Sequence, residues 1–578
     1  MGSHFLITTA EEQTWRLSKP ILFLGDWCKL YKKKESWKNL DSLTKNYHWD
    51  NRTQLFKDYR YLKKLYEKII LVCVDSLNEF HQVNYSVRYW KIFIGPWLYH
   101  FLQILFDRWA MIKSIENDEI SGTIILTGLD SKVLPLNINE CNKLYSSELW
   151  NHWIYGEIIR TIGTIPFEEV KYQPSRDLNP SINKLNKFKY FVKKIIGIYS
   201  FINKKNKYFF YGGPFNKFEQ LKLQFYLNEA PSFYDFAVNE EVSLEITKRD
   251  TFKVDYKVEN EFESFLIKMI PLQIPKYYLE GYNNLYKECK KKYWPNKPRC
   301  IITSSPIIWS DIFKFWVAEK VERGSKLIIS QHGGHYGVGK WNASEDHEID
   351  ISDEFSSWGW REKGVKPLSS VKLSRNKYQV SSSSDDILIA LGISHRYSYW
   401  LYSIPIASQW SDYLDDQVKF IELLPENIKK HAKLRVYSSD YNWSQKKRLS
   451  DKLPGVCFDD NENSFKSSVA DARIFIGTYN ATTFLETMSA NTPTIIFWNP
   501  LHSEIRDSAK PYFDLLFKAG IMHYSPESAA RYLARIWDNI DAWWSLKETQ
   551  KARLTFVEQF AKSSDNCLSE WKVFLDNY

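Results

Sequence analysis

Short apolar strands that alternate with helices constrain the fold of this chain more than any other feature. Residues 300–303 and 327–329 are apolar runs of strand length, and the helical pattern at 311–323 between them ends before Gly324. A strand, a helix and a second strand at this spacing are typical of a parallel sheet. The alternation resumes over residues 387–498. The sequence therefore predicts an α/β fold.

The length of the chain requires more than one domain. Its 578 residues exceed the ~250–300 that one hydrophobic core supports. The Ser-rich run SSSSDD at 381–386 is the best candidate for a linker. We expect two Rossmann-like domains facing across a cleft, an N-terminal one with insertions at 1–380 and a C-terminal one at 381–555. Residues 556–578 are predicted to form a last helix that crosses back to the first domain.

The most apolar segment of the first half covers residues 84–109. It is interrupted by Gly95-Pro96, and proline breaks or kinks a helix interior, so we expect two buried helices there. Residues 172–210 are rich in Lys and Asn with little periodicity, which predicts an insertion or loops around one helix.

Composition and charge exclude several classes of protein. The net charge of +9 suits an anionic ligand or membrane surface, but the Lys runs are too scattered for a nucleic-acid-binding domain. Seven widely spaced cysteines without a CxxC pair predict neither a zinc site nor a disulfide framework, and they fit a reducing cytoplasm. No run of ~18 apolar residues occurs, so we expect no transmembrane helix. The start of the sequence does not have the pattern of a signal peptide.

A histidine flanked by glycines follows the strand at 327–329. The stretch KLIISQHGGHYGVG places Gln331, His332, Gly333 and Gly334 after this strand. Ligands of open α/β sheets bind outside the carboxyl ends of the strands, and an imidazole there is a candidate acid or base. The alternative is a strand-ending turn that carries a surface histidine.

A second candidate site follows the predicted strand that ends at Ile476. Asn480 is a good helix N-cap, and Thr482 and Thr483 open the next helix, where free backbone N–H groups and the helix dipole favour an anion. Glu486 lies one turn further and could accept both hydroxyls of a ribose. The segment therefore predicts a site for a nucleotide-activated sugar, with plain helix capping as the alternative.

The predicted strand at 387–391 ends in GISHRY. Ser394, His395 and Arg396 are expected to reach the same ligand site, where the two basic groups could neutralise a phosphate or a sugar carboxylate. A surface loop with a chance basic pair is the alternative.

Segments spread over nearly the whole chain carry a family resemblance. They are FLITTAEEQTW with ILFLGDWC, SVRYWKIFIGPWL with FDRW, QHGGHYG, EDHEIDISDEFSSWGW and NATTFLETMSANTPTIIFWNP. With these segments the chain resembles GT-B glycosyltransferases, and more narrowly the sugar transferases of bacterial O-antigen and surface-polysaccharide gene clusters. QHG and NATTFLE are also distantly similar to capsule transferases that use CMP-Kdo, CMP-sialic acid or CDP-glycerol donors.

The resemblance implies a cytoplasmic, metal-independent glycosyltransferase without a cofactor. Its donor would bind the C-terminal domain, with a CMP-activated nonulosonic or Kdo-like acid as the leading expectation. Its acceptor would be a hydroxyl of a growing surface glycan, free or lipid-linked, reached through peripheral contact with the inner membrane face. The alternatives are a UDP-, GDP- or TDP-hexose donor, a non-catalytic nucleotide- or glycan-binding assembly protein, and phosphotransfer of the CDP-glycerol type.

The first domain would then supply the acceptor side. Asp26, Asp130 and His332 all follow predicted strands there, and Gln331 and Gly333 flank the histidine. An inverting transfer needs one base to deprotonate the attacking hydroxyl, whereas a retaining enzyme does not need that base in the same place. We predict His332 as this base.

The acidic group at 345–348 is the rival to His332. Asp346 or His347 could be the base instead, or either could orient His332.

Overall fold

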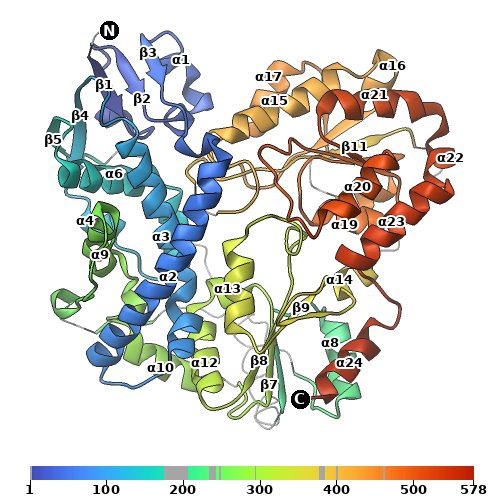
Figure 1. Cartoon of the computed structure of the whole chain (residues 1–578), viewed down its shortest axis with the longest axis horizontal. Helices are drawn as coiled ribbons and strands as arrows, with labels where there is room; N and C mark the ends of the chain where they lie inside the picture. Colours follow the sequence, from blue (N-terminus) through green and yellow to red (C-terminus); the bar gives the residue numbers. More distant parts are fainter. Residues whose placement is uncertain are drawn as a thin grey trace, which may run out of the picture.

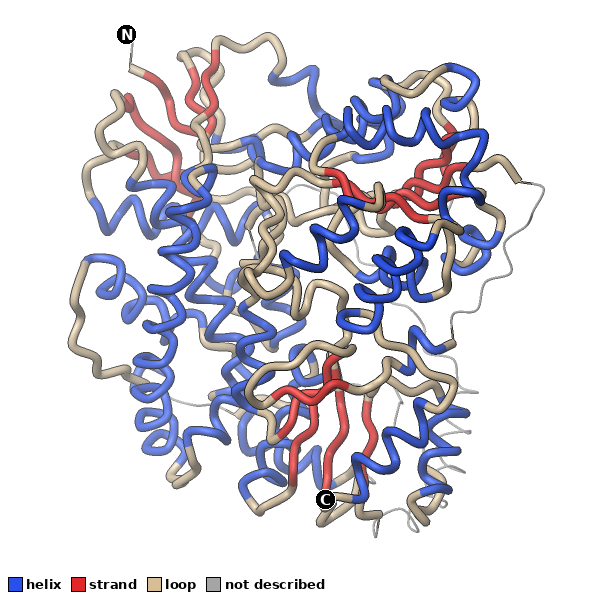
Figure 2. The backbone as a smooth tube through the Cα atoms, turned by 45° about the vertical axis from the view of Figure 1, so that its right-hand side comes forward, coloured by secondary structure: helices blue, strands red, loops and turns tan. Residues whose placement is uncertain are grey.

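The computed structural model describes the greater part of the chain, and the strands within it form three parallel sheets (Figures 1 and 2). The described residues are 3–174, 206–232, 242–245, 249–292, 294–375, 384–398, 401–459 and 463–578. The α/β class is confirmed, but the region predicted as one N-terminal domain holds two of the three sheets. The predicted boundary at 380–381 and most of the predicted insertion at 172–210 lie outside the described residues.

The first unit is built on a sheet of order β3-β2-β1-β4-β5. Its strands are β1 (His4–Ile7), β2 (Ile21–Phe23), β3 (Ser42–Thr44), β4 (Ile120–Thr127) and β5 (Phe167–Lys171). Its principal helices are α2 (Arg52–His81), α3 (Val87–Lys113) and α6 (Glu148–Ile162). Helix α3 packs against both α2 and α6, so the longest apolar segment of the chain lies in the core.

The prediction of two helices at 84–109 is wrong, because α3 continues through Pro96. A proline inside a helix costs about 3 kcal/mol through its lost hydrogen bond and a clash with the preceding turn. Most residues of α3 are buried, and the helix packs on α12 (Asp311–Glu322) and α13 (Ala343–Ile351) of the second unit as well as on α2 and α6. Burial of this many large side chains outweighs the local penalty.

The second unit is built on a sheet of order β10-β9-β8-β7-β6. Its strands are β6 (Tyr208–Tyr211), β7 (Cys300–Thr303), β8 (Lys326–Ser330), β9 (Glu354–Ser357) and β10 (Val365–Pro367). The predicted crossover is confirmed: α12 (Asp311–Glu322) connects the parallel strands β7 and β8. Helix α13 (Ala343–Ile351) follows β8 and leads back to β9.

The last helix also belongs to the second unit. Helix α24 (Cys567–Asp576) packs against α8 (Lys217–Tyr226), and Trp571 and Leu575 join a buried cluster with Phe210 of β6 and Ile328 of β8. The chain thus ends on a sheet that is completed about two hundred residues earlier (Figure 1).

The third unit is built on a sheet of order β13-β12-β11-β14-β15-β16. Its strands are β11 (Ile387–Ala390), β12 (Ala432–Arg435), β13 (Cys457–Phe458), β14 (Ile474–Gly477), β15 (Thr494–Phe497) and β16 (Met522–His523). The strand order runs outward in both directions from the neighbours β11 and β14. Such a reversal creates a crevice at the carboxyl ends of the two central strands, where open α/β sheets bind ligands.

The remaining helices cover the sheets and connect the units. They are α1 (Lys34–Trp37), α4 (Asp130–Val133), α5 (Ile138–Tyr145), α9 (Glu261–Gln273), α10 (Tyr282–Lys290), α11 (Pro306–Trp309), α14 (Val371–Ser374), α15 (Gln409–Glu422), α16 (Glu426–Lys429), α17 (Gln445–Lys452), α18 (Phe465–Ala470), α19 (Thr482–Ser489), α20 (Lys510–Lys518), α21 (Pro526–Ile536), α22 (Ile540–Trp544) and α23 (Lys547–Phe560).

Candidate functional site

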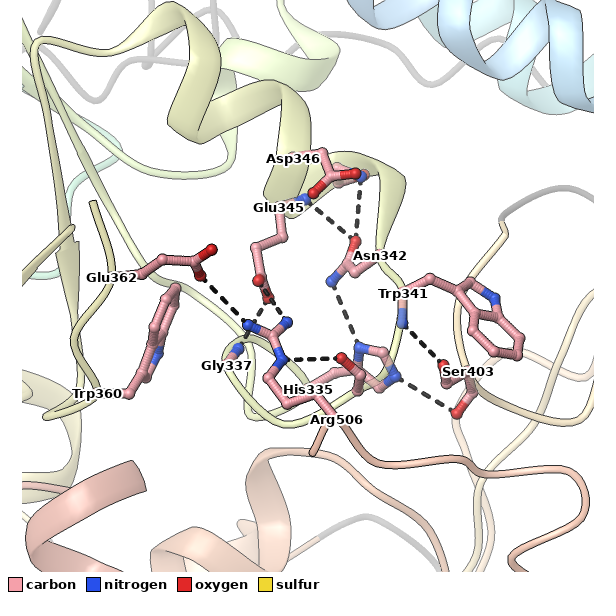
Figure 3. Close-up of polar contacts among 12 residues, drawn as sticks. His335, Gly337, Trp341, Asn342, Glu345, Asp346, Trp360, Glu362, Ser403 and Arg506 are labelled. Carbon is pink, nitrogen blue, oxygen red and sulfur yellow. Dashed lines mark hydrogen bonds and ion pairs between the residues drawn. The ribbon is translucent and has the colours of Figure 1, made fainter. Parts of the chain in front are cut away.

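The loop that carries His332 lies between the second and third units. We call residues 331–342 the β8–α13 loop. Backbone hydrogen bonds join it to the third unit: the N–H of Lys340 donates to the carbonyl of Glu504 at 3.0 Å, and that of Arg506 to the carbonyl of Val338 at 2.9 Å. The far end of the loop is held likewise to Ser403 (Figure 3). The position of the loop is therefore coupled to that of the third unit.

An ion pair fastens the same junction. The guanidinium of Arg506 lies 2.5 Å from Oε1 of Glu345 on α13, and Glu362 faces it at 3.6 Å (Figure 3). The other carboxylate oxygen of Glu345 accepts the N–H of Gly337 at 2.8 Å. Burial raises the pKa of Glu345 to about 7, although Arg506 opposes the shift. We call this pair the Arg506–Glu345 latch.

The β8–α13 loop touches the start of α19. The N–H of Gly334 donates to Oγ1 of Thr482 at 3.1 Å. A Cβ at position 334 would lie 2.5 Å from the carbonyl oxygen of Ala481, so only glycine permits this approach. At Gly333 a Cβ would find its nearest neighbour in Tyr336 at 3.5 Å, an ordinary contact. The two stretches that the sequence singled out therefore lie together.

One ring nitrogen of His332, Nε2, has hydrogen-bond partners, and the other, Nδ1, has none among the described residues. Its Nε2 lies 3.2 Å from Oε1 of Glu348 and 3.0 Å from the hydroxyl of Tyr336, which itself donates to Glu348 at 3.0 Å. The side chain of Glu348 is fully buried, whereas that of His332 is 29% exposed. Among the described residues, Nδ1 of His332 has no hydrogen-bond partner. A half-exposed imidazole backed by a buried carboxylate can act as a proton acceptor.

The two rivals of His332 in the acidic group do not contact it. Asp346 pairs with Lys63 at 2.8 Å and accepts the hydroxyl of Tyr59. His347 packs in the core beside Tyr66, and burial lowers its pKa to about 3, so it stays neutral. Residues 345–348 lie on one helix, and only positions three or four apart share a face. By that rule Glu345 and Glu348 share one face of α13, which Asp346 and His347 do not share with them. The rule does not identify Glu348 as the partner of His332.

A small cavity lies at the strand-order reversal of the third sheet. It has a volume of about 50 Å³, and its walls include Gly392 and Ser394 after β11 and Thr478 and Asn480 after β14. Asn480 is 3% exposed, and neither its amide oxygen nor its amide nitrogen has a hydrogen-bond partner among the described residues. The hydroxyl of Ser394 is equally unpartnered there. Leaving such groups unsatisfied costs about 1–3 kcal/mol each, so a polar ligand that paired with them would gain from doing so.

The first turn of α19 departs from the predicted capping. The N-cap is Ala481, not Asn480, and no side chain caps the helix. The prediction of Asn480 as a cap is therefore wrong, and Asn480 lines the cavity instead. Thr483 is in the first turn with Thr482, while the carboxylate of Glu486 lies 2.7 Å from Nζ of Lys372 on α14. Binding of a ribose by Glu486 stays a prediction, and it would have to replace this ion pair.

His395 and Arg396 turn toward the first unit, away from the cavity walls. Arg396 is buried, pairs with Glu148 at the start of α6 and donates to the carbonyl of Trp27. His395 lies 2.9 Å from the hydroxyl of Ser146, and burial lowers its pKa to about 4. The predicted basic pair is thus occupied by contacts between units, which leaves no geometric support for its binding a donor.

The remaining acceptor-side candidates are dispersed. Asp26 pairs with Lys29 at 2.7 Å, and Asp130 is exposed at the start of α4, both at the carboxyl end of the first sheet. Gln331 is buried, and its Oε1 accepts hydrogen bonds from Trp358 and Trp360, so it supports the loop instead of facing a ligand. No contact joins Asp26 or Asp130 to His332 within the described residues.

Two features are absent from the described residues. No group of three or more His, Cys, Asp or Glu side chains there is arranged to hold a metal ion. No helix in the same part of the chain is both long and apolar enough to cross a membrane.

Comparison with known proteins identifies a family. No curated protein matches the chain at a significant level. Three solved structures resemble parts of the chain at 10% sequence identity each. MurG of Acinetobacter baumannii has a TM-score of 0.34 and the match covers 64% of this chain and 99% of that one, and Anabaena HepE with UDP and glucose has a TM-score of 0.36 with the same coverage of 64% and 99%. The wall teichoic acid polymerase TagF has a TM-score of 0.31, and the match covers 68% of this chain and 98% of that one. With TM-scores below 0.5, these likenesses do not show what the present chain does. A family model does match residues 4–575, and the chain therefore belongs to the LIC12162 family transferases.

Proposed function

We propose that this transferase is a glycosyltransferase of the GT-B type that binds a nucleotide sugar at the β11–β14 edge of the third sheet. The observation that carries the proposal is the buried side chain of Asn480, whose amide oxygen and nitrogen both lack partners among the described residues beside a cavity at the strand-order reversal. An amide can donate and accept at once, which matches the edge of a nucleobase or the hydroxyls of a ribose. The uncapped start of α19 follows directly and favours a phosphate.

On this proposal, His332 deprotonates the acceptor. The acceptor oxygen forms a bond to the anomeric carbon of the donor sugar, and the bond from that carbon to the phosphate oxygen breaks. The proton of the acceptor hydroxyl passes to Nδ1 of His332, and the nucleotide leaves with the electron pair of the broken bond. The support for this role is the exposure of His332 beside the start of α19, to which Gly334 of the same loop is hydrogen-bonded.

The identity of the donor stays open between two classes. The similarity to capsule transferases favours a CMP-activated nonulosonic or Kdo-like acid, but Arg396, which would suit the carboxylate of such a donor, pairs with Glu148. A UDP-, GDP- or TDP-hexose needs no such cation. A surface glycan as acceptor, its lipid-linked form and peripheral contact with a membrane are further parts of the proposal, supported by the family resemblance alone.

A nucleotide panel tests the donor site. We expect one of CMP, UDP, GDP, TDP or ADP to raise the melting temperature of the full chain, since a ligand at about 100 Kd adds about 2.7 kcal/mol of stability. Asn480→Ala should abolish this shift, because it removes both polar atoms from the cavity wall. The matched control is Asn283→Ala, which changes an exposed asparagine of α10 and should retain the shift.

The outcomes separate the donor classes and the proposal itself. Stabilisation by CMP alone favours the acid donor, and stabilisation by UDP, GDP or TDP alone favours the hexose donor. If no nucleotide stabilises the chain, or if Asn480→Ala retains the full shift, a donor site at the β11–β14 edge is refuted.

A further inference from the structure

The buried carboxylate of Glu348 has no role in the proposed function so far. It lies on α13 and is fully excluded from solvent. Its Oε1 accepts a hydrogen bond from the hydroxyl of Tyr336 and lies within hydrogen-bond distance of Nε2 of His332. Its second oxygen, Oε2, has no hydrogen-bond partner among the described residues. A buried carboxylate is costly unless the groups around it compensate its charge. No lysine or arginine contacts Glu348 within the described residues, so His332 is the group that can supply a positive charge.

We propose that Glu348 is the positioning residue of His332, setting its tautomer and stabilising the proton that the imidazole receives. This inference rests on the proposed function, in which His332 accepts the proton of the acceptor hydroxyl. Its own basis is the geometry of three side chains, His332, Glu348 and Tyr336, and not the identity of the donor.

The hydrogen-bond network selects one tautomer. The single hydroxyl proton of Tyr336 is donated to Glu348, so the tyrosine oxygen can only accept from His332. Nε2 of His332 therefore carries the proton and donates it toward these two oxygens. The lone pair is then on Nδ1, the nitrogen that has no partner among the described residues. This is the arrangement that a general base requires.

The same geometry assists the proton transfer itself. When Nδ1 accepts the proton from the acceptor hydroxyl, the imidazole becomes a cation with Glu348 at 3.2 Å from Nε2. A charge-assisted hydrogen bond in a water-poor site is stronger than a neutral one. Tyr336 keeps Oε1 of Glu348 directed at the ring, so the carboxylate acts without touching substrate.

The first test measures His332 without reference to turnover. The full chain is treated with diethyl pyrocarbonate over a range of pH, and modification of His332 is followed by peptide mass spectrometry. Glu348 from α13 and Tyr336 from the loop are the titratable groups that contact His332 in the described part of the chain. A nearby carboxylate favours the protonated ring, so Glu348→Gln should move the midpoint of modification to lower pH.

The matched control changes another buried carboxylate of the same helix. Glu345 pairs with Arg506 and does not contact His332, so Glu345→Gln should leave the midpoint where it is in the wild type. Glutamine has the shape of glutamate and preserves a hydrogen-bond acceptor, and a melting curve of each variant verifies that it is folded. An unchanged midpoint in folded Glu348→Gln overturns the inference, as does an equal shift in Glu345→Gln.

The second test uses turnover with whichever nucleotide sugar the panel identifies. Glu348→Gln should lower kcat on the order of a hundredfold, at the low end of the 10²–10⁴-fold that general base catalysis contributes, with the KM for the donor unchanged. Glu348→Asp, which restores the charge, should recover part of the loss. A larger KM with unchanged kcat would contradict the positioning role.

The two readouts keep this inference separate from the proposed base. If Glu348→Gln shifts the midpoint but His332→Ala retains full turnover, the pairing of Glu348 with His332 stands and the base assignment fails. If His332→Ala abolishes turnover while Glu348→Gln shifts neither midpoint nor kcat, the base assignment stands and the role of Glu348 is refuted.

Discussion

Single glycines determine how closely the β8–α13 loop approaches α19. Gly333 and Gly334 are adjacent in sequence, yet only Gly334 lies against backbone, with the carbonyl of Ala481 at 2.5 Å from the position of a Cβ. The backbone of a neighbouring helix cannot move aside for a Cβ at position 334, whereas the end of a flexible side chain could rotate away. The contact with α19 therefore requires the second glycine of the pair and not the first.

Replacement of these glycines should separate the two roles. Gly334→Ala is expected to lower the free energy of unfolding by about 1–3 kcal/mol, the usual cost of an overpacked site, because loop and helix must move apart. Gly333→Ala should change it by far less, since its Cβ would meet Tyr336 at an ordinary 3.5 Å. Urea denaturation of both variants measures the difference, and equal losses would contradict this account.

At the scale of elements, the terminal helix depends on one aromatic side chain. Trp571 of α24 is 2% exposed and packs against Phe215, next to the second sheet. The opposite side of α24 carries Val573, which is 66% exposed. The helix is thus held by one apolar face, on which Trp571 is the largest side chain.

Truncation of this side chain should detach α24. Trp571→Ala is expected to cost about 3–5 kcal/mol, as for large aromatic side chains removed from a core, and to expose the C-terminal segment to proteolysis. Val573→Ala on the exposed side is the control and should leave both properties nearly unchanged. Limited proteolysis with mass spectrometry reports the cleavage sites. Equal cleavage of the two variants would show that Trp571 does not hold the helix.

At the scale of the whole molecule, the second and third units are joined by the Arg506–Glu345 latch and by backbone hydrogen bonds of the β8–α13 loop. Burial raises the pKa of Glu345 from its ordinary 4.5 to about 7. Between these values the folded chain binds a proton at Glu345 that the unfolded chain has released. The contribution of Glu345 to stability therefore decreases as pH rises through this window.

Replacement of Glu345 should remove this pH dependence. Relative to the wild type, Glu345→Gln is expected to gain stability as pH rises from about 5 to about 7.5, because glutamine never ionises. Glu362→Gln, which alters the exposed carboxylate 3.6 Å from Arg506, is the control and should show a flat difference. Chemical denaturation at several pH values gives both curves. A flat difference for Glu345→Gln would contradict the latch as described.

Local sequence patterns account for the individual elements and for the two stretches that meet. The β7–α12–β8 crossover, the α/β class and the candidate loops at His332 and Asn480 follow from apolar periodicity and from polar residues placed after strands, which are local properties. Membership of a sheet is not local. Local patterns therefore predict one domain for residues 1–380, although these residues hold two sheets, of order β3-β2-β1-β4-β5 and β10-β9-β8-β7-β6.

Contacts between distant segments select the side chains that share a site. Arg396 is predicted to bind a ligand, but it pairs with Glu148 of the first unit. Glu348 is one of several acidic residues at 345–348, and it is the one that contacts His332. Helix α3 continues through Pro96 because it is packed among other helices, most extensively α2, α6, α12 and α13. In each case the deciding partner is distant in the chain or is selected by packing. The reason is physical: burial and pairing energies depend on neighbours in space, and a linear pattern does not specify them.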